Sequence, residues 1–126
     1  MNKKLEEGNE VSKKSNESGL KHWWQQKLSA VAMFPLTIWF LINLPSFLSL
    51  SYTSKVAWLE KTTNSVFLIL FLLISSYHMK LGLIVVIEDY IHNNFIKRLL
   101  IKALQIFTLA SSVLLLVLVL KFLRII

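Results

Sequence analysis

One long apolar stretch, SVFLILFLLISSYHMKLGLIVVIEDY at residues 65–90, decides the fold of this chain. Up to residue 87 it contains a single formally charged side chain, Lys80. About 20 consecutive apolar residues are enough for a helix to cross a hydrocarbon core of about 30 Å. The stretch therefore predicts a transmembrane helix that ends near its Asp89–Tyr90 pair.

Small and polar residues share one side of this predicted helix. Gly82 lies four positions after His78, and Asp89 lies eleven positions after it. Because each residue advances by about 100° around a helix, all three fall near one face. Ionisable residues at membrane depth are rare and usually functional, and small residues allow close helix packing. We therefore interpret this face as a packed interface within the membrane.

Two more apolar blocks accompany the central one, so the predicted spans are residues 28–50, 65–88 and 99–120. Each block is about 22 residues long, which suits one membrane crossing. Hydrophobic residues make up 55% of the chain and are concentrated in these blocks. The predicted fold class is all-α, an integral membrane three-helix bundle without a soluble core.

The first 20 residues have a different composition, with four lysines and four glutamates among asparagine and serine. Low hydrophobicity without periodicity predicts a disordered polar tail at residues 1–20. The segment does not resemble a cleavable signal peptide, because it is acidic and no short apolar stretch with a cleavage site follows. The remaining residues, 21–126, form the predicted membrane domain, which opens with Trp23–Trp24 as an interfacial anchor.

The net charge of +7 is first a topology signal in a membrane protein. Basic residues near the membrane ends on the N-terminal side are Lys21, Lys27, Lys97, Arg98 and Lys102. Those on the opposite side are Lys55, Lys61, Lys121 and Arg124. This bias predicts an inside N terminus and an outside C terminus. No basic and aromatic pattern indicates a nucleic-acid partner, so the lipid bilayer is the first expected partner.

Several kinds of chemistry are excluded by the residue types. The chain has no cysteine, which excludes disulfides, thiolate metal sites and cysteine nucleophiles. Ser75 or Ser76 beside His78 is not a hydrolase site, because no acid lies within reach on that helix segment. His22, His78 and His92 lie at different depths, which does not suit a zinc site.

Spacing alone leaves two interpretations of His78. A haem iron needs only one imidazole from each of two chains, and a single buried histidine on a small-residue face suits that arrangement. Alternatively, His78 forms a hydrogen bond with a neighbouring helix and holds no cofactor.

The pattern around His78 resembles the hydrophobic membrane-anchor subunits of succinate dehydrogenase (respiratory complex II). That family has a histidine, a glycine one turn later and an Asp–Tyr pair eleven residues after the histidine, here His78, Gly82 and Asp89–Tyr90. The opening HWWQQKLSA at residues 22–30 is similar too, with tryptophan before a basic residue and a Ser/Thr–Ala pair. The resemblance covers roughly residues 22–126. Lys27 stands where the family more often has arginine, so the charge is kept without the planar fork.

The resemblance implies a function for each of these residues. His78 would be an axial ligand of haem b, with the second ligand from a sister cytochrome b anchor subunit. Tyr90 would donate a hydrogen bond to ubiquinone, with Asp89 close by. The chain would be a non-catalytic subunit of a larger hetero-oligomeric membrane domain in the inner (cytoplasmic) membrane. It would hold the iron–sulfur and flavoprotein subunits, through which electrons pass from succinate to the quinone.

Two alternatives stay open at this point. One is the anchor of the similar fumarate reductase, and the other is a cofactor-free three-helix structural or regulatory protein. Lys80 is not assigned a role by this reasoning, and in particular not that of a partner for a haem propionate. It lies roughly 200° around the helix from His78, so it should meet a partner helix, a polar lipid group or water.

Overall fold

The computed structural model describes residues 2–123, which are almost entirely helical. Three of the helices are long and apolar enough to cross a membrane, which confirms the predicted all-α membrane bundle. The predicted span 28–50 extends one residue past its helix, which ends at residue 49. The predicted spans 65–88 and 99–120 fall within the two following long helices. Arg124, used in the charge comparison, lies outside the described residues. The helices are α1 (Asn2–Ser49), α2 (Tyr52–Glu60), α3 (Thr62–Tyr90) and α4 (Asn94–Phe122).

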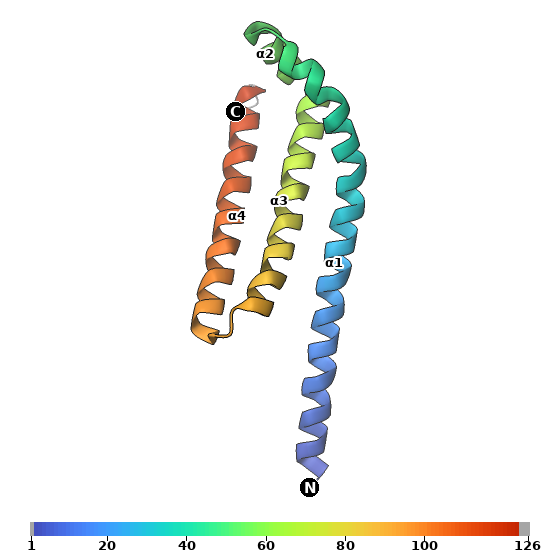
Figure 1. Cartoon of the computed structure of the whole chain (residues 1–126), viewed down its shortest axis with the longest axis vertical. Helices are drawn as coiled ribbons and strands as arrows, with labels where there is room; N and C mark the ends of the chain where they lie inside the picture. Colours follow the sequence, from blue (N-terminus) through green and yellow to red (C-terminus); the bar gives the residue numbers. More distant parts are fainter. Residues whose placement is uncertain (1, 124–126) are drawn as a thin grey trace.

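The helix α3 lies between α1 and α4 and contacts both (Figure 1). The N terminus and the turn between α3 and α4 lie at one end of the molecule, and α2 and the end of α4 lie at the other. The chain thus passes back and forth between two ends, as three successive membrane crossings require.

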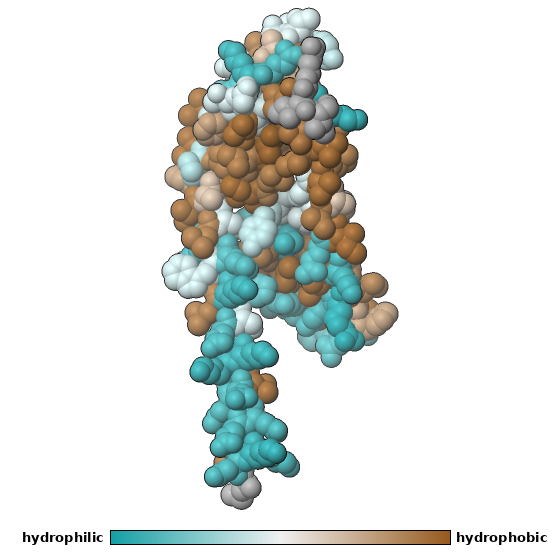
Figure 2. Space-filling view, turned by 180° about the vertical axis from the view of Figure 1, so that it is seen from behind, coloured by the Kyte–Doolittle hydropathy of each residue, from teal (hydrophilic) through white to brown (hydrophobic). Residues whose placement is uncertain are grey.

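Most large apolar side chains lie on the outside of this arrangement. Figure 2 shows a band of hydrophobic residues across the upper middle of the molecule, with more hydrophilic residues above it, on the projecting part of α1 and at the α3–α4 end. Few residues are buried within the described chain, namely Ser29, Leu36, Ser65, Leu81, Ile84 and Thr108. An exposed apolar surface of this kind fits lipid and partner membrane helices.

The N-terminal part of α1 differs from the prediction of a disordered tail. Residues 2–20 are helical, so the boundary placed at residue 20 falls inside one continuous helix. Their side chains are all exposed, and Figure 1 shows this part projecting beyond the other helices. Lysine and glutamate are good helix formers, and extending the existing apolar helix is easier than nucleating a new one. The absence of apolar periodicity therefore did not mean the absence of a helix.

Side-chain caps define where α2 and α4 begin. Ser51 Oγ accepts a hydrogen bond from the backbone N–H of Ser54 at 3.4 Å. Asn93 Oδ1 accepts from the backbone N–H groups of Phe95 and Ile96 at 2.9 and 3.2 Å. Such caps satisfy backbone donors that have no partner inside the helix. The Asn93 cap fixes the tight return of α4 beside α3, and thereby the end of the bundle where Tyr90 lies.

Candidate functional site

His78 lies on α3 on a side that meets α1. Its Nδ1 is 2.8 Å from Oγ of Ser29 on α1. Ser29 Oγ also donates a hydrogen bond to the backbone carbonyl of Gln26, at 2.9 Å. Only 7% of Ser29 is exposed, so little solvent competes for these bonds. The histidine of the apolar stretch is therefore tied to a neighbouring helix through one serine.

The two hydrogen bonds of Ser29 favour one tautomer of His78. A serine hydroxyl has one proton, and here that proton goes to the Gln26 carbonyl. With its proton on that carbonyl, Ser29 Oγ accepts from His78, which corresponds to the tautomer with the proton on Nδ1 and the lone pair on Nε2. Within residues 2–123, Nε2 has no hydrogen-bond partner. The two interpretations of His78 are thus compatible, because the interhelical bond and a metal would use different nitrogens.

A hollow of about 360 Å³ adjoins His78. Its other lining residues all come from α1 and are Trp23, Gln26, Lys27, Ala30 and Val31. Lys27 Nζ lies 4.8 Å from the centroid of the Trp23 ring, a distance typical of a cation–π contact. The positive charge of Lys27 and the anchoring Trp23 therefore border the same space as the imidazole.

The face shared by His78 and Gly82 is half-buried against α1. A Cβ added at Gly82 would lie 4.0 Å from Nε2 of Gln26, an ordinary van der Waals contact. The neighbour of this face within the chain is α1. The third member of the face, Asp89, is exposed, so the packing ends before the helix does.

Asp89 and Tyr90 form the last residues of α3 and lie apart from His78. Tyr90 is 76% exposed, and the separation from His78 along the helix axis is roughly 18 Å. Nearby, Lys97 Nζ donates a hydrogen bond to the backbone carbonyl of Glu88 at 3.1 Å. The predicted site residues therefore form two locations, an imidazole inside the apolar span and a phenol with a carboxylate at the end of α3.

Lys80 faces α4, away from the α1 side where His78 is bonded. Its Nζ lies 4.7 Å from the centroid of the Tyr77 ring. It lines a hollow of about 290 Å³ with polar residues of α4, among them Gln105, Thr108 and Ser112. The opposite placement of Lys80 and His78 agrees with their angular separation, and Lys80 borders the same hollow as polar side chains of α4.

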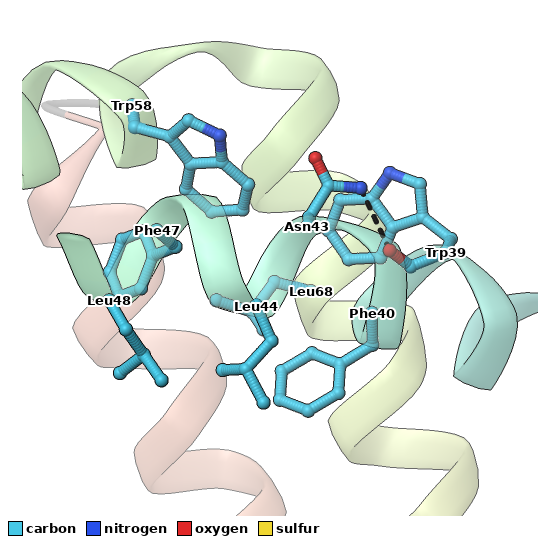
Figure 3. A pocket seen from close by; sticks show the side chains of 8 residues that line it. All are labelled: Trp39, Phe40, Asn43, Leu44, Phe47, Leu48, Trp58 and Leu68. Atoms are coloured by element: carbon cyan, nitrogen blue, oxygen red, sulfur yellow. Dashed lines mark hydrogen bonds between the residues drawn. The ribbon is translucent and has the colours of Figure 1, made fainter. Parts of the chain in front are cut away.

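A third hollow, of about 210 Å³, lies at the other end of the bundle (Figure 3). It is lined by Trp39, Phe40, Asn43, Leu44, Phe47, Leu48, Trp58 and Leu68. Asn43 Nδ2 donates to the Trp39 carbonyl at 2.8 Å, and Trp39 stacks on Trp58 with centroids 6.1 Å apart. No titratable or metal-ligating side chain lines it. We interpret it as interfacial aromatic packing between α1, α2 and α3.

The donor set around His78 suits a haem better than an isolated metal ion. Within the described residues, no three His, Cys, Asp or Glu side chains come together. His22 and His92 are exposed and outside the apolar spans. A haem iron takes its equatorial ligands from the porphyrin and needs only axial ones from protein. One imidazole with a free Nε2 fits that need, and a second axial donor would come from another chain.

Comparison with known proteins leads to the same class of membrane subunit. The family model described as "Succinate dehydrogenase/Fumarate reductase transmembrane subunit" matches residues 3–119. The chain belongs to this family. The predicted resemblance to the succinate dehydrogenase anchor is confirmed, and the chain is a multi-pass membrane protein.

The relatives of this family member carry consistent names. The succinate dehydrogenase hydrophobic membrane anchor subunit of Rickettsia bellii is 32% identical over 100 residues, which is 79% of each chain. The same subunit of Rickettsia typhi is 30% identical over 109 residues, covering 81% of this chain and 82% of the relative. The succinate dehydrogenase membrane anchor subunit of Reclinomonas americana is 30% identical over 78 residues, or 60% of this chain and 65% of the relative. No solved structure matches.

The interpretation of the sequence alone gave Ser29 no role. The signal was present in the Ser/Thr–Ala pair of the opening motif, here Ser29–Ala30. Its connection to His78 spans 49 positions and depends on how α1 and α3 are aligned. That alignment is a property of the packed helices and not of either sequence segment.

Proposed function

We propose that this chain anchors a succinate:ubiquinone oxidoreductase in the membrane and supplies one axial haem ligand, Nε2 of His78. The observation that carries the proposal is an intramembrane imidazole whose Nδ1 is bonded to Ser29 while Nε2 has no partner among the described residues. Metal-ligating histidines almost always donate their other N–H to a nearby acceptor. Membership of the family supports the same assignment.

The proposed cofactor is haem b, shared with the sister cytochrome b anchor subunit. A b-type haem accepts and releases one electron at a time. The role of this chain's residues would be to ligate the haem iron and to orient the ligating ring. His78 would offer the lone pair, and Ser29 would hold the ring.

The proposed ubiquinone contact is at the other location, the end of α3. The Tyr90 phenol can donate one hydrogen bond to a quinone carbonyl. Asp89 beside it would orient that donor or relay protons when the quinone takes up two electrons and two protons. Because Tyr90 is largely exposed in this chain, partner subunits would form the rest of the pocket.

The electrons would be delivered by partner subunits, because this chain has no iron–sulfur cluster site of its own. It has no cysteine and so cannot hold an iron–sulfur cluster in the usual way. We therefore propose that it is not an enzyme by itself and that it holds the iron–sulfur and flavoprotein subunits against the inner membrane. The relatives above are named as succinate dehydrogenase subunits, which favours succinate oxidation over fumarate reduction.

The direct test is a dithionite-reduced minus oxidised absorption spectrum of the complex purified through this chain. We expect the iron–sulfur and flavoprotein subunits to copurify and the spectrum to have b-type bands. A complex with full succinate dehydrogenase activity and no b-type signal would reject the haem part of the proposal. Purification of the chain without either soluble subunit would instead support the cofactor-free structural interpretation.

The proposed orientation has the N terminus inside and the C terminus outside. It is supported by the basic residues near the N-terminal side and by the common end shared by the N terminus and the α3–α4 turn. A reporter inserted at Asn93–Asn94 should therefore read as internal, and one fused after Ile126 as external. The reverse result would put Tyr90 at the outer surface, where a soluble donor on the inner side has no access to it.

A further inference from the structure

We propose that Ser29 is a positioning residue for His78, and that its hydroxyl sets the tautomer, the ring orientation and the donor strength of Nε2. The inference rests on the proposed haem function and deepens it. It assigns a role within the site to a residue of α1, whereas the ligand itself is on α3. Three observations carry it: the direction of the hydrogen bonds, the burial of the serine and the packing beside it.

The second hydrogen bond of Ser29 favours the role of acceptor toward the imidazole. Its proton is used by the Gln26 carbonyl at 2.9 Å, so at 2.8 Å from Nδ1 it acts as an acceptor. An acceptor at Nδ1 excludes the tautomer with the proton on Nε2, which could not bind iron. Without this acceptor, both tautomers of a neutral histidine would be accessible.

Burial makes this bond strong relative to its alternatives. Ser29 is 7% exposed, and the histidine is half-buried in an apolar span. Little water is available there to replace a lost hydrogen bond, and an unpaired buried N–H is costly. The bond therefore restrains the ring, because rotation about the side-chain torsions would leave the Nδ1–H without an acceptor.

Packing beside the bond limits movement of α1 against α3. Gln26 and Ser29 lie one turn apart on α1, and they meet Gly82 and His78, which lie one turn apart on α3. The Gln26 side chain lies beside Gly82, 4.0 Å from where a Cβ of that residue would be. These two contacts along one interface hold the serine in register with the imidazole.

The consequence for bound iron has a definite direction. A hydrogen bond from Nδ1–H to an acceptor increases electron density on Nε2 and makes it a more basic ligand. A more basic ligand stabilises the ferric state more than the ferrous state and lowers the midpoint potential. Loss of the acceptor should raise the potential and weaken haem retention, with losses of metal affinity of about 10- to 100-fold typical for such outer-shell partners.

The test compares Ser29→Thr with Ser29→Val in the assembled complex, because the two side chains have the same shape and differ in the hydroxyl. The readouts are haem per assembled complex, the midpoint potential of the haem, and its low-spin EPR signal, which reports ligand orientation. We expect Ser29→Thr to resemble the parent. We expect Ser29→Val to lose haem on dilution or washing about tenfold more readily, to have a higher potential and to have a shifted EPR signal.

A control separates this effect from a general loss of helix hydroxyls. Thr37 on α1 also donates to its own helix, to the Met33 carbonyl at 2.8 Å, and has no histidine partner among the described residues. Thr37→Val should leave all three readouts unchanged. Equal potentials, EPR signals and haem contents in Ser29→Thr and Ser29→Val would overturn the inference.

The proposed function itself is judged by a different variant. If His78→Ala keeps the low-spin haem, the ligand assignment fails, and the inference about Ser29 fails with it. If His78→Ala loses the haem while the Ser29 pair are indistinguishable, the ligand assignment stands and only the positioning role is rejected.

Discussion

Replacing His78 with alanine is expected to abolish the low-spin b-type haem signal of the complex. Alanine removes the proposed donor at Nε2, and the other two histidines, His22 and His92, are exposed and outside the apolar spans, so neither replaces it. The haem would be lost or would remain with one axial ligand and become high-spin. The measurement is the reduced-minus-oxidised spectrum, normalised to the amount of assembled complex, with EPR for the spin state.

His22→Ala and His92→Ala are the matched controls, since each removes an imidazole from an exposed position. Both should leave the spectrum unchanged. An unaltered low-spin spectrum in His78→Ala would exclude this residue as a ligand. Partial quinone reduction is expected to survive the loss of haem, because electrons from the soluble subunits can reach a quinone near Tyr90 without passing through the bilayer interior.

Tyr90→Phe is expected to reduce the rate of ubiquinone reduction several-fold at limiting quinone. The change keeps the ring and removes only the hydroxyl that is proposed to donate to a quinone carbonyl. A hydrogen bond to a neutral acceptor contributes on the order of 1 kcal/mol, which corresponds to about fivefold, and more if it strengthens in the transition state. Assembly, haem content and succinate oxidation by an artificial acceptor that reacts at the soluble subunits should all remain normal.

Tyr52→Phe provides a control at the opposite end of the molecule. Tyr52 opens α2 and is 82% exposed, compared with 76% for Tyr90, so both variants lose a phenol hydroxyl from a similarly open position. Tyr52→Phe should reduce ubiquinone at the parent rate. Parent-like activity in Tyr90→Phe under the same limiting quinone would exclude Tyr90 from the quinone site.

The spanning helices were predictable because hydropathy is a local property of the sequence. Residues 65–88, for example, are apolar enough to define a membrane crossing without knowledge of any partner. The angular position of each residue around this helix also follows from the local sequence. It correctly separated Lys80, which faces α4, from the side with His78 and Gly82, which meets α1.

Two features were not predictable in the same way. The helix at residues 2–20 has no apolar face, so periodicity contains no information about it. The contact between Ser29 and His78 depends on the axial alignment of α1 and α3, which results from packing along their whole length. The phase of α3 identified a polar face, but it did not identify which residue of which helix would meet it.

The long helices stand in a row, with α3 between α1 and α4. The hollow beside His78 is lined by the imidazole and by residues of α1, with no residue of α4. A prosthetic group bound at His78 would remain uncovered until a second polypeptide closes over it. Capture of the group and recruitment of the sister chain are then thermodynamically coupled, and each increases the affinity for the other by the same factor. The amount of haem bound to this chain would therefore be proportional to the number of assembled complexes, and not to the number of copies of the chain that are synthesised.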